Sequence, residues 1–199
     1  VVATDGHRLA TSVLSMDQGV SEVNQVIIPR KGILELQRML SEEEGDVEIS
    51  LGSNHMRAQA SQMTLTTKLV DGKFPDYNRV IPKNGNKVIS AEREVLRQAL
   101  SRTAILSNEK FRGIRLNISD EQIQLSANNP EREEAEELVS VEYSGADLEI
   151  GFNVGYLLDA LGVAEGKNVK VTLNDANSPA LIESPDNEQT VYVVMPMKL

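Results

Sequence analysis

The 199-residue sequence contains no cysteine and no tryptophan, and aromatic residues make up only 4% of it. Without cysteine the chain can form neither a disulfide framework nor a thiolate metal site, which is typical of a protein from a reducing cytoplasm. No apolar run approaches the roughly 18 residues that a membrane-spanning helix needs. The scarcity of aromatic side chains also argues against a surface that binds nucleic acid by stacking its bases.

Basic residues are also fewer than acidic ones: the sequence has 20 Lys and Arg and 30 Asp and Glu, which gives a net charge of −10. A field of this sign argues against non-specific adhesion to DNA or to anionic lipid. Much of the acid lies in "SEEEGD" and "PEREEAEE", which we expect to be exposed loop or strand edge. The 40% of hydrophobic residues suffices for a buried core in one domain or two small ones.

Three stretches have the apolar periodicity of amphipathic helices, at residues 30–40, 91–106 and from 154 to Gly162 or Gly166. Pro29 suits the start of the first helix. The apolar positions of the first two helices are Ile33, Leu36, Met39 and Leu40, then Val95, Leu96, Ala99, Leu100 and Thr103.

Alternating apolar and polar residues predict strands in three other places. Val47, Ile49 and Leu51 alternate in "DVEISLGSNHMRAQA", which predicts a half-buried strand and a turn at "SNH", and "QMTLTTKLV" is the expected partner. "RLNISDEQIQLSAN" has the pattern of a β-hairpin, with its apolar positions at Leu116, Ile118, Ile123 and Leu125.

The sequence also repeats itself at an offset of 122 residues. Seven apolar positions from Ile28 to Leu51 fall on apolar positions from Ile150 to Leu173. The repeat predicts two units, residues 1–86 and 87–199, joined by the turn-rich "PKNGNK". Because a unit like the second would begin roughly 37 residues before Val1, we expect the first unit to be truncated.

No catalytic or cofactor site emerges from the residues. Asp5 with His7 could form a catalytic pair, but the chain has only two histidines, and no serine or carboxylate is placed to complete a triad or a metal site. "GFNVGYLLDALG" lacks the lysine and the glycine spacing of a phosphate loop. A hydrolase and a plain nucleic-acid binder are therefore the disfavoured alternatives, and we expect neither metal nor cofactor.

Five separated motifs, "ATDGHRLA", "FPDYNRVIP", "AILSNEKFRG", "GFNV" and "YVVMPMKL", resemble in order the β sliding clamp family of bacterial DNA polymerase III. The resemblance implies an α+β fold of repeated clamp domains, each with two helices packed on antiparallel sheets. Residues 1–86 would be most of the second domain and residues 87–199 the third. Two full-length protomers would close head to tail into a non-catalytic ring around duplex DNA, which increases polymerase processivity.

The same resemblance implies partners and site residues. A cleft between the two domains would bind short Gln/Leu/Phe peptides of the polymerase III α subunit, the clamp loader δ subunit, other polymerases and mismatch-repair proteins. The matching positions are Thr4, Gly6, His7, Arg8, Leu9, Pro75, Arg79, Val80, Asn153, Tyr156, Val193, Val194, Met195, Pro196, Met197, Lys198 and Leu199. Without the resemblance, Met195 and Met197 would more often be buried core, and Arg79 could be a surface ion pair. Pro179 stands where many relatives have a small serine.

Two further surfaces follow from a ring. Ile105 and Leu106 match the apolar part of the contact between protomers, so a chain without the first domain should be a monomer. Transient contacts with phosphate are expected from the basic helix residues Arg30, Lys31, Arg38, Arg97 and Arg102. The alternative for these five is an ordinary solvated helix face.

Overall fold

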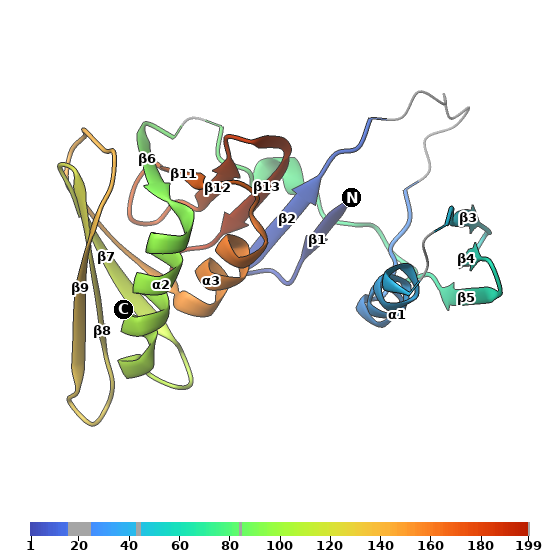
Figure 1. The fold of residues 1–199 in the computed structure, drawn as a ribbon, viewed down its shortest axis with the longest axis horizontal. Coiled ribbons are helices and arrows are strands. Elements are labelled where there is room, and N and C mark those ends of the chain that lie inside the picture. Colours follow the sequence, from blue (N-terminus) through green and yellow to red (C-terminus); the bar gives the residue numbers. More distant parts are fainter. Residues whose placement is uncertain (16–24, 43–44, 84, 199) are drawn as a thin grey trace. The chain divides into compact units, whose positions relative to one another are not determined.

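A computed structural model describes residues 1–15, 25–42, 45–83 and 85–198. The chain divides into two compact units, and each is α+β with antiparallel sheets. Unit 1 comprises Val1–Ser15 and Tyr77–Leu199, and unit 2 comprises Met16–Asp76. The described helices are α1 (Arg30–Ser41), α2 (Arg93–Thr103) and α3 (Val154–Val163) (Figure 1).

Unit 1 contains two antiparallel sheets. The order in the six-stranded sheet is β1 (Val2–Thr4), β2 (Arg8–Ser12), β13 (Asn187–Val194), β12 (Ala180–Ser184), β11 (Asn168–Leu173) and β6 (Lys87–Glu92). The order in the four-stranded sheet is β10 (Leu148–Asn153), β7 (Gly113–Ser119), β8 (Gln122–Asn128) and β9 (Glu134–Ser140). Strand β2 therefore joins the start of the chain to its end, with Leu9 opposite Val193.

The core of unit 1 lies where α2 and α3 pack against the two sheets (Figure 1). Leu96 and Leu100 of α2 are at most 4% exposed, and Phe152 at the end of β10 is 1% exposed. The predicted hairpin is confirmed as β7 and β8, because its four alternating apolar side chains are all buried in this core. The acidic segment after Pro130 forms the edge strand β9, with most of its carboxylates exposed as expected.

Unit 2 is smaller. Helix α1 packs against the sheet of β3 (Glu48–Leu51), β4 (His55–Ala60) and β5 (Met63–Lys68). A Cβ added to Gly32 would lie 2.7 Å from Oγ1 of Thr67, so glycine permits the close approach of the helix to β5. Met39, Ala58 and Ala60 form its small core.

The internal repeat is visible in the order of the elements. After α1 come β3, β4 and β5, which are neighbours in that order in one sheet. After α3 come β11, β12 and β13, which are neighbours in the corresponding order in another sheet. In unit 1 the second set is completed by α2, which packs on α3, and by β6, which pairs with β11.

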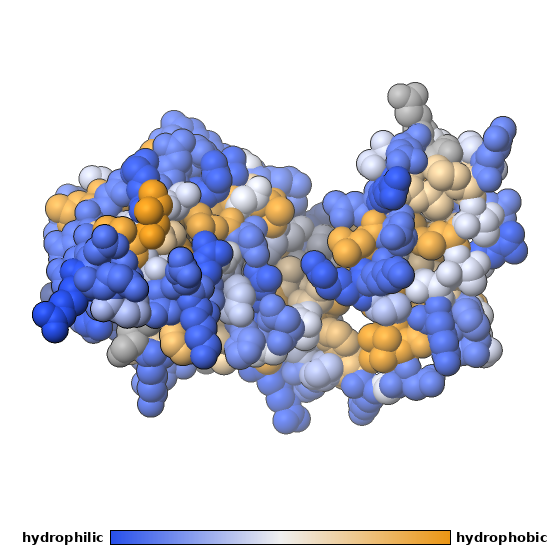
Figure 2. Space-filling model, turned by 90° about the horizontal axis from the view of Figure 1, so that it is seen from below, coloured by the Kyte–Doolittle hydropathy of each residue, from blue (hydrophilic) through white to orange (hydrophobic). Residues whose placement is uncertain are grey.

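Several positions expected to be buried are exposed instead. Ile33 and Leu40 of α1 are 40% and 45% exposed, and Ile49 and Leu51 of β3 are 48% and 45% exposed. In the described part of unit 2 no second helix packs on α1 in the way that α2 packs on α3, so these apolar side chains stay exposed. Apolar surface is accordingly visible on this unit (orange in Figure 2). Val95, 47% exposed, lies at the border of the buried face of α2.

The predicted end of the third helix is also wrong. Helix α3 continues through Gly162 to Val163, and Ala164 is its C-cap, with its N–H donating to the carbonyl of Ala160. Gly166 follows with a φ of +81°, in the left-handed region, so it serves the turn after the helix. None of the helices in the described part of the chain is long and apolar enough to cross a membrane.

Candidate functional site

The turn between β1 and β2 is fixed by two side chains. One oxygen of the Asp5 carboxylate accepts the backbone N–H groups of His7 and Arg8, each at 3.0 Å. Oγ1 of Thr4 accepts the N–H of Gly6 at 3.1 Å and donates to the carbonyl of Arg8 at 2.7 Å. Gly6 has a φ of +89°, which an L side chain rarely adopts. Four hydrogen bonds within residues 4–8 thus stabilise the turn.

Arg8 connects this turn to α3. Its guanidinium forms ion pairs with Asp5, at 3.0 Å, and with Asp159 of α3, and it lies 4.5 Å from the centre of the Tyr156 ring. The Asp159 carboxylate is the main reason that the pKa of Arg8 is raised. Burial alone would raise the pKa of Asp5, but the hydrogen bonds from His7 and Arg8 outweigh it and lower that pKa.

The imidazole of His7 stacks on Tyr156, with the ring centres 6.2 Å apart and the planes 19° from parallel. The Asp5 carboxylate binds the backbone and Arg8, and its hydrogen bond to His7 goes to the main chain. This is the geometry of a structural turn beside an aromatic side chain, so the alternative of an Asp5–His7 catalytic pair gains no support.

The C-terminal segment after β13 runs alongside the turn. The N–H of Met195 donates to the carbonyl of His7, and the N–H of Met197 donates to the carbonyl of Gly151 in β10, each at 2.9 Å. Val193 and Val194 are buried, whereas Met195 is 37% exposed. The segment therefore joins the six-stranded sheet to the free edge of β10 and presents a methionine at the surface.

Asn153 serves the fold at the start of α3. Its Oδ1 accepts the N–H of Gly155 at 2.9 Å as the N-cap of the helix, and its Nδ2 donates to the carbonyl of Phe111 at 3.1 Å. A role in a neighbouring subsite remains a prediction.

The structure brings one set of the predicted cleft residues together. The residues from Thr4 to Leu9, Tyr156 and the segment from Val193 to Met197, which includes Pro196, come together in unit 1. Arg79 closes a short 3₁₀ turn, Tyr77–Arg79, and Val80 beside it is 37% exposed. Pro75 belongs to unit 2. Lys198 is exposed, and Leu199 lies outside the described residues.

Pro179 directly precedes β12, where Ala180 pairs with Val194. It thus lies near the last residue of β13. That Pro179 changes the hydrogen bonding at the edge of the proposed cleft stays a prediction.

Sequence reasoning missed Asp159 and gave Asp5 only a catalytic alternative. The available signal for Asp159 was its position on α3, three residues after Tyr156, which places both side chains on one face of the helix. Nothing local in the sequence indicates that Arg8, 151 residues away, meets this face.

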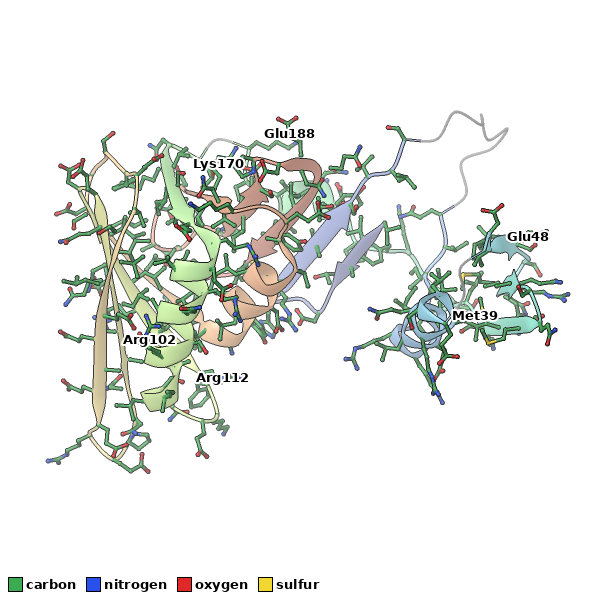
Figure 3. All side chains as sticks on the ribbon, viewed as in Figure 1. Met39, Glu48, Arg102, Arg112, Lys170 and Glu188 are labelled. Carbon is green, nitrogen blue, oxygen red and sulfur yellow. The ribbon has the colours of Figure 1, made fainter. Side chains whose placement is uncertain are left out.

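The basic residues of the helices are largely engaged with acids. Arg97 donates to Glu94 at 2.7 and 2.9 Å, and Arg102 binds both carboxylate oxygens of Glu137 on β9 (Arg102 is labelled in Figure 3). The Arg97 guanidinium lowers the pKa of Glu94 to about 2. On α1, Nε of Arg38 lies 3.5 Å from Glu42, and Arg30 and Lys31 are exposed.

Ile105 and Leu106 lie in the 3₁₀ turn that follows α2, Ala104–Leu106. Ile105 is 77% exposed and Leu106 is half-buried. An exposed isoleucine of this kind is compatible with a contact between protomers, which stays a prediction.

Two family models cover nearly the whole chain. Residues 1–76 match the central domain of the DNA polymerase III beta subunit, and residues 78–198 match its C-terminal domain. The chain is 58% identical over 198 residues to the beta sliding clamp of Pseudomonas aeruginosa, and 50% identical to that of Escherichia coli. It spans about half the length of these curated relatives, since it covers 54% of each.

Solved structures of sliding clamps share the fold of this chain. A crystal structure of the DNA polymerase sliding clamp from P. aeruginosa with ligand superimposes with a TM-score of 0.96 at 57% identity, covering 100% of this chain and 54% of that one. A sliding clamp from the same organism, bound to griselimycin, gives a TM-score of 0.95 at the same identity and coverage. A Caulobacter crescentus clamp matches with a TM-score of 0.95 at 36% identity, again over 100% of this chain and 54% of its own.

Proposed function

The chain belongs to the DNA polymerase III β subunit family, the β sliding clamps, and from this premise we propose that the full-length protein is a non-catalytic ring around duplex DNA. Such a ring increases the processivity of a replicative polymerase. Residues 1–86 would be part of the second domain and residues 87–199 the third. The family models, which meet at residues 76–78, support a boundary in this region. The cytoplasm is the compartment that we propose, because the replicated chromosome lies there.

The peptide cleft is the part of the function that the local geometry supports best. In unit 1 the hydrogen-bonded turn packs on the ring of Tyr156, and the His7 carbonyl accepts the N–H of Met195, whose side chain is exposed; together these groups would be a suitable wall for Leu and Phe side chains. A relative at 57% identity binds griselimycin, and this also supports a ligand-binding surface. We propose that the polymerase III α subunit, the clamp loader δ subunit, other polymerases and mismatch-repair proteins dock here through short peptides.

A titration of labelled peptide tests this proposal. A peptide with the pattern Gln-x-x-Leu-Phe should bind with a dissociation constant near micromolar, about −8 kcal/mol, because burial of two apolar side chains is opposed by ordering of the peptide. A matched peptide with Ala in place of Leu and Phe should bind at least tenfold more weakly. Equal affinities of the two peptides, measured by fluorescence anisotropy, would contradict the proposed cleft.

Contact with DNA should be weak and independent of sequence. Arg97 and Arg102 already bind carboxylates, so phosphate would have to compete with Glu94 and Glu137 for them. Retention on DNA would then depend on closure of the ring, and this chain should bind duplex only weakly, losing affinity steeply as salt rises. Tight sequence-specific binding at physiological salt would refute this view.

Closure would require a head-to-tail contact between two full-length protomers, with Ile105 and Leu106 on one side. We therefore propose that the present chain is a monomer in dilute solution. Light scattering gives the mass directly, and a stable closed dimer of this chain would overturn the assignment of the two residues to that contact.

A further inference from the structure

The carboxylate of Asp159 is the one group from α3 that forms an ion pair with the turn at residues 5–8 in the described part of unit 1. We propose that Asp159 is a positioning residue of the peptide cleft, which holds Arg8 across Tyr156 and thereby sets the orientation of the side chains at the turn. This inference rests on the proposed cleft, and it concerns a residue outside the peptide-contacting set.

The first step is the fixing of Arg8. Its guanidinium has acidic partners on two sides, Asp5 from its own turn and Asp159 from α3, while its face lies over Tyr156. Because Asp5 belongs to the same turn as Arg8, its ion pair cannot restrain Arg8 relative to α3. Of the two carboxylates, only that of Asp159 restrains Arg8 relative to α3.

The second step leads from Arg8 to the groove walls. The adjacent residue, His7, stacks on the same Tyr156 ring, and the carbonyl of His7 accepts the N–H of Met195. The pairing of Arg8 with Val194 holds the backbone here, so release of Arg8 from Asp159 would chiefly free the Arg8 guanidinium and the His7 ring over Tyr156. The ion pair therefore bears on the side chains at the turn, whereas strand pairing holds the terminal segment.

The ion pair is exposed enough that its role is geometric more than energetic. The side chain of Asp159 is 69% exposed and that of Arg8 is 34% exposed, so solvent screens their attraction. Loss of the pair should leave the fold intact, because neither side chain belongs to the buried core. Its loss should instead widen the range of orientations of the Arg8 and His7 side chains and lower the affinity for a ligand that packs against them.

The test compares three variants by peptide titration. Asp159→Asn keeps the shape of the side chain but removes its charge, and we expect it to weaken binding of the Gln-x-x-Leu-Phe peptide about fivefold to tenfold. Asp159→Glu restores the carboxylate and should bind within about twofold of the unchanged chain. Glu137→Gln makes the same carboxylate-to-amide change at the Arg102 pair, and it should leave the affinity unchanged.

A second readout needs no peptide. The chain has two histidines, His7 in the turn and His55 in unit 2, so their ring protons are readily assigned by NMR. Because His7 stacks on Tyr156, Asp159→Asn should shift the His7 signals, and it should leave those of His55 and the circular dichroism spectrum unchanged.

Unchanged His7 signals or unchanged peptide affinity in Asp159→Asn would overturn the inference. Failure of the unchanged chain to bind peptide would instead reject the proposed cleft. In that case the His7 signals alone still decide whether Asp159 positions the turn.

Discussion

Deletion of the terminal segment, Met195–Leu199, should weaken peptide binding but leave the protein folded. A chain that ends at Val194 loses the backbone hydrogen bonds of Met195 to His7 and of Met197 to Gly151. At about 0.5–1.5 kcal/mol each, their loss lowers the free energy of unfolding by about 1–3 kcal/mol. The domain should survive this loss, because a typical domain is stable by about 5–15 kcal/mol and Val193 and Val194 remain buried.

The deletion should weaken peptide binding by a larger fraction than it lowers the free energy of unfolding. The deletion removes the surface against which an apolar anchor of the peptide would be buried, and such burial contributes about 1.5–3 kcal/mol for a Leu or Phe side chain. Since each 1.4 kcal/mol is tenfold in affinity, we expect the dissociation constant to rise by about one to two orders of magnitude.

Fluorescence anisotropy gives the affinity, and circular dichroism with urea unfolding gives the fold and its stability. Glu188→Ala, an exposed change on the preceding strand β13, is the control and should alter neither quantity (Glu188 is labelled in Figure 3). Equal peptide affinity of the intact and shortened chains would show that the segment is no wall of the groove. An unfolded shortened chain would show that the segment belongs to the core.

Three further predictions concern unit 1. The carboxyl of Glu94 should titrate near pH 2 by NMR, and Arg97→Gln should return its pKa toward 4.5, because Arg97 is the main cause of the shift. Since the folded-state pKa is the lower one, the stability that this pair contributes is present above pH 4.5 and disappears as the pH falls toward 2. Gly166→Ala should lower the unfolding free energy by more than about 1 kcal/mol in urea titrations, because φ is +81° and the new Cβ would overlap the Asp186 carboxylate. Leu100→Ala should cost about 2–5 kcal/mol by the same method, whereas Leu138→Ala, at a 65% exposed side chain, should stay within about 0.5 kcal/mol.

Local sequence patterns predicted those elements whose cores are made by their own neighbours. Leu96 and Leu100 recur with the period of α2, and the β7–β8 hairpin joins two alternating runs across a short turn. The same reasoning failed for Ile33 and Ile49. Periodicity indicates which face of an element is apolar, but it cannot say whether another element covers that face.

The site was predictable to a similar extent. The family resemblance carried by "ATDGHRLA" and "YVVMPMKL" predicted that the turn and the terminal segment line one cleft. The pairing of Leu9 with Val193 brings their flanking strands together, and the cleft itself stays a prediction. The partnership of Arg8 with Asp159 depends on how α3 meets the turn, which is a tertiary contact without a local signal. Glu94, the acid partner of Arg97, lies three residues before it on α2 and had a local signal, whereas Glu137, the partner of Arg102, comes from β9 and had none.

The antiparallel pairing of β2 with β13 has a consequence for the order of folding. These strands come from opposite ends of the sequence, so their pairing closes the longest loop in unit 1, whereas β7 and β8 need only a short turn. The entropy of loop closure and the dependence of rate on contact order favour the short hairpin as an early event and the attachment of β2 as a late one. The amides of β2 should therefore open to hydrogen exchange at a lower free energy than those of β7, and a ligand seated beside His7 would raise that local free energy without changing the rest of the protein.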